Sequence, residues 1–228
     1  MTTYATRPMA LPQCVTLPPF LAIHPVPPPP PQACSALLWG DANVARIAVR
    51  TAAAAVNRGI AVAVIDGAMA FDVTAIAADA QARRVPPERW LRHIYIARAF
   101  TCHQVATLLC ERLDPLLASQ SVGLVILLGP CTTFFDENVP FKDAFLLFQR
   151  VLRKIEALCT RGPLLLMAQA LDGYRTRRTL FVRELMKAVE LGIRVSTVEG
   201  RRHVQLVKPR LPRQSPASPI MQGSDSRR

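Results

Sequence analysis

A candidate phosphate-binding loop lies early in the chain, where a short apolar run ends at Gly40 and a helix-forming segment follows. Backbone N–H groups at a helix N-terminus attract anions, so a strand, a glycine and a helix in succession are typical of such loops. Compared with the motif Gly-x-x-x-x-Gly-Lys-Ser/Thr, residues 40–47 keep the first glycine. Ala45 replaces the second glycine, Arg46 replaces the lysine, and Ile47 replaces the hydroxyl residue that holds magnesium. We therefore expect the remnant of a nucleotide site, with no catalytic residue and no cofactor.

The two charged residues of this segment do not restore the motif. Arg46 carries a positive charge, but its forked guanidinium is bulkier than a lysine ammonium that reaches through a tight glycine loop. Asp41 would place a negative charge where a phosphate should lie. No Gly-Lys-Ser or Gly-Lys-Thr triplet occurs elsewhere in the chain, so an intact loop is not hidden in another segment.

Other reactive side chains do not form a recognisable site. The six cysteines include no Cys-x-x-Cys pair and no nearby histidine at ligand spacing, which argues against zinc. The histidines are isolated from carboxylates, and no Gly-x-Ser-x-Gly elbow is present, so a hydrolase triad has no visible components. Asp66 stays open as a metal ligand, but an acid at a strand end more often caps the next turn. We predict no metal site.

A basic segment late in the chain is the candidate nucleic-acid contact. Tyr174, Arg175, Arg177 and Arg178 follow an apolar run, and arginines neutralise phosphates while a tyrosine can stack on an unpaired base. The alternative is that these arginines only cap and solubilise the start of the next helix. Arg201 and Arg202, in a predicted hairpin turn, either extend the same basic surface or are plain surface charge.

The net charge of +12 favours a polyanionic partner such as nucleic acid, or less readily an anionic membrane surface. Its distribution is uneven: residues 142–228 hold 18 Lys/Arg and 7 Asp/Glu, whereas residues 1–141 hold 10 and 9. The net charge is therefore +11 in residues 142–228 and +1 in residues 1–141. A solvated face with a basic tail explains the same numbers, so charge alone does not choose.

The alternation of short apolar runs with longer amphipathic segments predicts an α/β fold with a mostly parallel central sheet flanked by helices and a C-terminal β-hairpin. Expected strands lie at about 36–39, 61–65, 93–97, 124–128 and 164–168, and the hairpin pairs 194–198 with 203–208 around Glu199-Gly200. Expected helices lie at about 44–57, 73–84, 101–118, 141–159 and 180–190.

Composition divides the chain into three parts. Residues 1–33 form a proline-rich arm that favours an extended polyproline II conformation, and residues 210–228 form a basic tail with too little apolar content to pack. Residues 34–209 form the core. The scattered cysteines suit a reducing cytoplasm, and neither a secretion signal nor an apolar run of membrane-spanning length is evident. We expect a cytoplasmic protein without a membrane partner.

Over roughly residues 34–209 the chain resembles the RecA/RadA recombinase family. The most specific match is the stretch 93–101, His-Ile-Tyr-Ile-Ala-Arg-Ala-Phe-Thr, followed by His103-Gln104 and Leu108-Leu109. Ile65-Asp66 followed by Phe71, and Gln169 at the end of an apolar run, are similar to strand ends of the family. The resemblance implies a RecA-like P-loop NTPase fold.

The same resemblance implies that the chemistry is missing. The catalytic glutamate of the family would fall at Ala68 and the Walker B aspartate at Leu128, and neither replacement can hold magnesium or accept a proton. The nucleotide-site remnant would consist of Gly40, Ala45, Arg46 and Gln169. The DNA-contacting loops would be residues 132–142, which carry acids, and residues 170–179, which carry the arginines.

These observations predict a non-catalytic accessory protein of DNA recombination or repair, with the SOS response as one setting. It would bind DNA, single-stranded by preference, a recombinase or translesion polymerase partner, or both. Two alternatives stay open. One is a protein-interaction module without direct DNA binding, and the other is an ATPase that completes its site with a neighbouring subunit of an oligomer.

Overall fold

The computed structural model describes residues 35–161, 163–171, 177–199 and 201–208. The predicted arm and tail lie outside these residues. The described part is an α/β fold with one seven-stranded sheet in the order β3-β2-β4-β5-β1-β6-β7. Its strands are β1 (Ser35–Gly40), β2 (Ala61–Asp66), β3 (Ile94–Arg98), β4 (Val122–Leu128), β5 (Leu164–Ala170), β6 (Leu191–Val198) and β7 (Arg201–Lys208).

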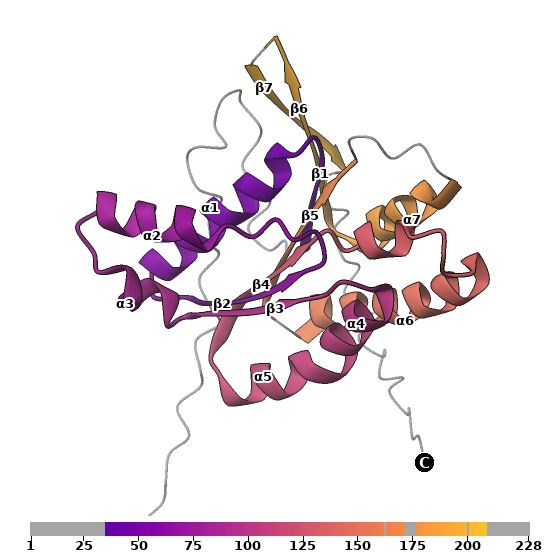
Figure 1. Ribbon diagram of the computed structural model, residues 1–228, viewed down its shortest axis with the longest axis horizontal. Helices are drawn as coiled ribbons and strands as arrows, with labels where there is room; N and C mark the ends of the chain where they lie inside the picture. Colours follow the sequence, from indigo (N-terminus) through magenta and orange to yellow (C-terminus); the bar gives the residue numbers. More distant parts are fainter. Residues whose placement is uncertain (1–34, 162, 172–176, 200, 209–228) are drawn as a thin grey trace, which may run out of the picture.

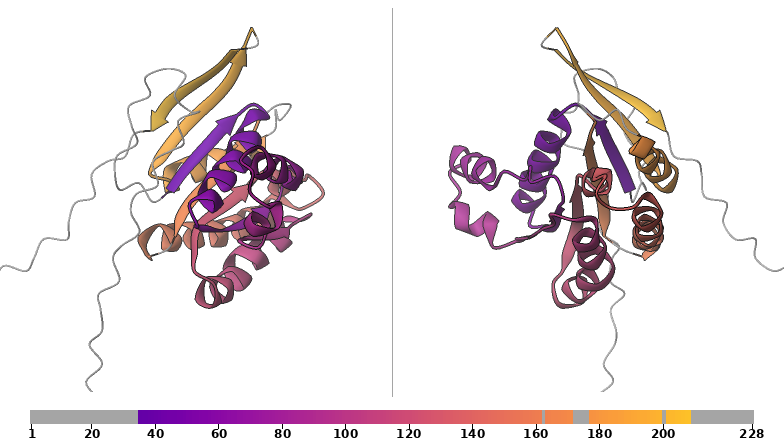
Figure 2. Two further views of the ribbon diagram at one scale, coloured as in Figure 1. Left: turned by 90° about the vertical axis from the view of Figure 1, so that its left-hand side faces the viewer. Right: turned by 45° about the vertical axis from the view of Figure 1, so that its right-hand side comes forward.

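All neighbouring strands are parallel except β6 and β7, which form the predicted antiparallel hairpin. Helices cover both faces of the sheet, as Figures 1 and 2 show. One face carries α1 (Asn43–Asn57), α2 (Val73–Ala82) and α3 (Pro87–Leu91). The other carries α4 (Cys102–Thr107), α5 (Leu113–Ser119), α6 (Phe141–Arg161) and α7 (Leu180–Ala188). Each face buries its own hydrophobic cluster.

Local sequence explains most element boundaries. The run of alanines at 52–55 favours α1, and Gly59, with φ +77°, takes the left-handed conformation that commonly ends a helix. Asp72 caps α2 by accepting hydrogen bonds from the backbone N–H groups of Thr74 and Ala75. Thr101 caps α4 in the same way, by accepting from Gln104 N.

The expected helix at 101–118 is helical throughout but not uniform. A π-helical turn, η2 (Leu108–Arg112), joins α4 to α5. Pro115 lies three residues beyond this turn, and its missing N–H and bulky ring disturb the regular pattern of hydrogen bonds in the preceding turn.

Two expectations need correction. The expected helices did not include α3, which begins at Pro87, because a proline tolerates the first helical position, where no N–H is needed. Arg201 and Arg202 do not sit in the turn of the hairpin. Both lie within β7, which begins two residues earlier than expected and pairs from Val198↔Arg201 onward.

Candidate functional site

The carboxyl ends of β4, β5 and β1 lie side by side, because these three parallel strands are neighbours in that order. This edge therefore brings together Gly40 at the end of β1, Leu128 at the end of β4 and Gln169 near the end of β5. Ligands of open α/β sheets bind outside the carboxyl ends of the strands. The expected nucleotide-site positions thus meet where such a site should be.

The connection from β1 to α1 is too short to wrap a phosphate. Only Asp41 and Ala42 separate Gly40 from Asn43, where α1 begins. Ala45 and Arg46 therefore lie on the first turn of the helix and not on a loop. Gly40 has φ +139°, and a Cβ atom there would lie 1.8 Å from the carbonyl oxygen of Val195 on β6. The first position of the motif is thus occupied by a glycine that allows close packing against β6.

The carboxylate of Asp41 closes the N-terminus of α1. Its Oδ1 accepts a hydrogen bond from Asn43 N at 2.9 Å, and its Oδ2 accepts one from Thr197 Oγ1 on β6 at 2.6 Å. Partial burial pushes the pKa of Asp41 upward, but these hydrogen bonds and the charge of Arg202 outweigh it, so the pKa is lowered. The position at which a P-loop would bind a phosphate therefore already holds a negative charge.

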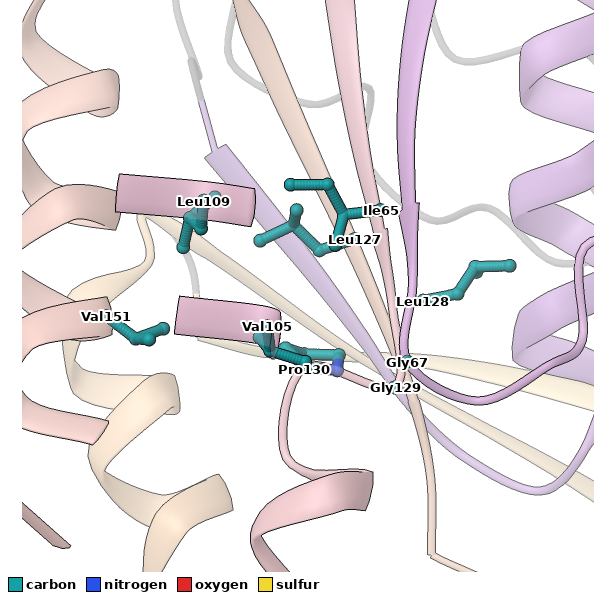
Figure 3. A pocket seen from close by; sticks show the side chains of 9 residues that line it. All are labelled: Ile65, Gly67, Val105, Leu109, Leu127, Leu128, Gly129, Pro130 and Val151. Atoms are coloured by element: carbon teal, nitrogen blue, oxygen red, sulfur yellow. The ribbon is translucent and has the colours of Figure 1, made fainter. Parts of the chain in front are cut away.

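Hydrocarbon fills the positions at which magnesium would be held. Ile47 and Leu128 are each 1% exposed, and both belong to the hydrophobic cluster between the sheet and α1. Figure 3 shows the Leu128 side chain pointing away from Leu127, toward the α1 side of the sheet. Arg46 stays exposed and donates only a long hydrogen bond to Asn43 Oδ1, at 3.4 Å. The buried side chains of Ile47 and Leu128 therefore offer no oxygen to a cation.

Asp66 caps the turn after β2, as expected for an acid at a strand end. It is fully buried, and its carboxylate accepts hydrogen bonds from the backbone N–H groups of Ala68, Ala70 and Phe71 at 3.0–3.2 Å. Arg98 lies 3.8 Å from Oδ2. This carboxylate holds the turn after β2, and the side chain of Ala68 supplies no base.

A small apolar cavity lies on the other side of the same strand ends (Figure 3). Ile65, Gly67, Leu127, Gly129 and Pro130 line it together with residues of α4, η2 and α6. Its free volume of about 10 Å³ is no more than one water molecule occupies. A nucleotide does not fit this space.

Gln169 links the segments that follow β4 and β5. The side chain is fully buried: Oε1 accepts a hydrogen bond from Cys131 N at 2.8 Å, and Nε2 donates to Ala170 O at 2.8 Å and Thr132 Oγ1 at 3.2 Å. In this conformation every polar atom of the amide is used within the protein. Gln169 therefore positions the turn after β4.

Arg178 lies inside the protein and not on a basic surface. It is 7% exposed, and its guanidinium donates to the carbonyl oxygens of Phe134 at 3.0 Å, Asp136 at 2.6 Å and Val139 at 2.6 Å. It thereby fastens the segment after β4 to the short helix η4 (Arg177–Thr179). Tyr174 and Arg175, the other expected contacts of this segment, lie outside the described residues, and only the backbone of Arg177 is described.

The two hairpin arginines face opposite sides of the sheet. Arg202 pairs with Thr197, and this pair lies on the α1 side, near Asp41. Arg201 pairs with Val198 on the other side and is exposed. Sequence reasoning missed Arg194, which also lies on that second side, with its guanidinium carbon 5.3 Å from the centroid of the Trp39 ring. Apolar residues at 193 and 195 alternate with Arg194, a signal that could have placed it on the solvent face.

Within the described ranges, no group of three or more histidine, cysteine, aspartate or glutamate side chains is arranged to hold a metal ion. No helix in the same part of the chain is both long and apolar enough to cross a bilayer. Neither a scan against protein-family models nor a search of curated proteins found a match.

Proposed function

We propose that this chain is a RecA-like pseudo-ATPase, a non-catalytic accessory protein of DNA recombination or repair. It binds single-stranded DNA, a recombinase or translesion polymerase partner, or both. The observation that carries the proposal is the carboxyl edge, where Asp41, Ile47 and Leu128 stand at the positions to which the RecA resemblance would assign phosphate and metal binding.

The energetics of phosphoryl transfer support the non-catalytic part. Catalysis of this reaction depends on positioning and on neutralising phosphate charge by magnesium and a lysine. At this edge the nearest charge to the α1 N-terminus is the Asp41 carboxylate, with a lowered pKa that keeps it ionised. A triphosphate would have to displace this carboxylate, and the side chains of Ile47 and Leu128 would offer its metal no oxygen.

The DNA-binding part is supported by the excess of basic residues in residues 142–228, 18 Lys/Arg against 7 Asp/Glu. When basic side chains neutralise the phosphates of a nucleic acid, counterions are released, and this release favours binding. Arg201 and Arg194 are exposed on the same side of the hairpin, so part of this charge is available to a partner.

We also propose that the protein resides in a reducing cytoplasm, which the state of its cysteines supports. The described cysteines, Cys102, Cys110, Cys131 and Cys159, form no disulfide. Burial raises the pKa of the Cys102, Cys110 and Cys131 thiols, which makes them poor nucleophiles.

Two measurements on the full chain test this function. Fluorescence anisotropy with a labelled single-stranded oligonucleotide across a salt series should show binding that weakens linearly in log–log form as salt rises. A turnover assay should show no magnesium-dependent ATP hydrolysis. Absence of oligonucleotide binding at low salt removes the DNA-binding part. Hydrolysis that Arg46→Ala abolishes would favour an ATPase whose site a neighbouring subunit completes.

A second candidate is a protein-interaction module, which exposed apolar side chains on α6 favour. The side chains of Phe141 and Leu146 are 45% and 59% exposed, so neither is buried in the core. Capture of a purified recombinase or translesion polymerase by the immobilised chain after nuclease treatment would support this candidate. Leu146→Glu should abolish such capture if this part of α6 is the contact, and should leave oligonucleotide binding unchanged.

A further inference from the structure

The β6–β7 hairpin has two faces of different character. Opposite residues of an antiparallel pair lie on the same face, and successive residues lie on opposite faces. Ile193 and Val195 are buried against the α1 side, so their partners on β7 lie there too. The other face carries the pairs Arg194↔Gln205, Ser196↔His203 and Val198↔Arg201. We call these six residues the open face.

Solvent reaches the open face because α7 covers only its base. Met186 of α7 packs on Gly192, and Lys208 Nζ donates hydrogen bonds to the carbonyl oxygens of Met186, Lys187 and Val189 at the end of the helix. Beyond this point the hairpin extends past the other strands (Figure 1). Arg194, Arg201, His203 and Gln205 are all exposed.

Arg194 is held in place by an aromatic ring. Its guanidinium carbon lies 5.3 Å from the centroid of Trp39, a distance typical of a cation–π contact. The parallel register pairs Trp39 with Arg194 on one side and with Gln169 on the other, so a row of polar and aromatic side chains crosses this face of the sheet. The indole N–H of Trp39 is buried without an acceptor among the described residues. The Trp39 ring thus supports the Arg194 guanidinium, which lies over it.

The charge of the open face has one sign. The six residues include two arginines, Arg194 and Arg201, and no carboxylate. Asp41 accepts its hydrogen bond from Thr197, which lies on the opposite side of the hairpin. Glu199 is in the turn between the strands and is exposed. Spaced cations on an exposed β-ribbon match the repeating negative charge of a nucleic-acid backbone.

We propose that the open face binds single-stranded nucleic acid, with Arg194 and Arg201 on its phosphates and the supported guanidinium plane of Arg194 beneath an unpaired base. Arginine planes and aromatic rings stack on unpaired bases, which a duplex does not offer. This inference rests on the proposed DNA-binding function and assigns it to residues other than those that the sequence favoured. Arg202 and Arg178, which face Asp41 and the interior, are excluded from the contact.

Anisotropy titrations of the full chain with a fluorescein-labelled 20-mer of thymidine test the assignment. The double variant Arg194→Gln/Arg201→Gln should bind about tenfold more weakly at 100 mM salt, with its salt slope reduced by about 1.4, about 0.7 per lost phosphate contact. The matched control is Arg58→Gln/Arg89→Gln, which removes the same charge from exposed sites at the opposite edge of the sheet. It should change the affinity by less than about twofold.

The results of these titrations distinguish a wrong contact surface from a wrong function. If the wild-type chain binds and the two double variants lose the same affinity, the open face is not the contact, although the DNA-binding function stands. If the wild-type chain does not bind, the function itself fails. Competition by a 20-bp duplex or by poly-L-glutamate as effective as that by unlabelled single strand would overturn the single-strand assignment.

Tryptophan emission gives a readout that a purely electrostatic effect does not. Trp39 and Trp90 are the two tryptophans, and Trp90 is buried on the opposite side of the sheet. In a Trp90→Phe background, saturating oligonucleotide should change the Trp39 emission. The change should disappear in Arg194→Gln, which must keep its wild-type circular dichroism spectrum. An unchanged emission in the Trp90→Phe protein, with binding intact, contradicts the stacking arrangement.

Discussion

The two sides of the sheet's carboxyl edge contrast sharply, although β1 contributes neighbouring residues to both. On the α1 side, which we call the closed site, Asp41 caps the helix and Ile47 and Leu128 exclude water. On the α7 side, Trp39 supports Arg194 and the open face stays in solvent. One side of this sheet edge is therefore closed by a carboxylate and buried hydrocarbon, whereas the other side presents exposed arginines.

The largest effect is expected at Gly40, which separates the two sides. Gly40→Ala places a Cβ atom against the Val195 carbonyl of β6, at a φ of +139° that alanine rarely adopts. Because the obstacle is backbone, β1 and β6 must move apart. We expect the free energy of unfolding to fall by about 3–5 kcal/mol, measured by urea denaturation with circular dichroism.

Gly59→Ala is the matched control for this substitution. Gly59 also has a positive φ, +77°, but nothing lies within 4 Å of the position that a Cβ atom would occupy there. Its cost should be only about 1 kcal/mol, the cost of the left-handed conformation. Equal losses in the two variants would show that contact with β6 is not what requires glycine at 40.

The next largest effect is expected at Arg178, which the sequence predicted to lie on the basic surface. Arg178→Met leaves the carbonyl oxygens of Phe134, Asp136 and Val139 without this donor. We expect a loss of about 2–4 kcal/mol in the free energy of unfolding. Arg183→Met, at a side chain that is 72% exposed on α7, should stay within about 0.5 kcal/mol. Weaker oligonucleotide binding by Arg178→Met, with unchanged stability, would return Arg178 to the DNA contact.

The smallest effect concerns Asp41 and its dependence on pH. The folded pKa is below the usual value of 3.8, so the ionised carboxylate stabilises the fold above that pH, and this contribution is lost as the pH falls through the folded pKa. Asp41→Asn should therefore lower stability by about 0.5–1 kcal/mol at pH 7. The difference from wild type should shrink below about pH 4.

Thermal unfolding of both proteins at pH 7 and at pH 3.5 measures this difference. Thr197→Val removes the hydroxyl that donates to Asp41 Oδ2 and should reduce the pH dependence of the gap. A gap that is constant between the two pH values would mean that the Asp41 charge does not stabilise the closed site.

Much of the fold could be predicted because local signals agree with the tertiary structure. Alanines at 52–55 and Gly59 bracket α1, and the apolar run within β4 has the length of a buried strand. The sequence missed α3, because a proline pair usually marks the end of helical structure, whereas Pro87 occupies the first position of α3. The end of the hairpin was also misplaced, since the pairing of β7 with β6, and not local propensity, extends it to Arg201.

The site was less predictable than the fold. The sequence already shows that the side chains of Ile47 and Leu128 have no oxygen to offer a metal ion. The position of Asp66 at a strand end also indicated its capping role, which the structure confirms. The burial of Arg178 could not be inferred from residue type, because only the fold brings the carbonyl oxygens of Phe134, Asp136 and Val139 to its guanidinium.

The amino-acid sequence alone establishes which groups are present: no lysine or hydroxyl side chain in residues 40–47, no acid at position 128, and an excess of arginine late in the chain. Only the tertiary structure decided where the remaining charges point. Strand register places each side chain on one face or the other, and a shift by one residue would exchange Arg201 with Arg202. That register depends on burying Ile193 and Val195 against α1, a contact between segments more than a hundred residues apart.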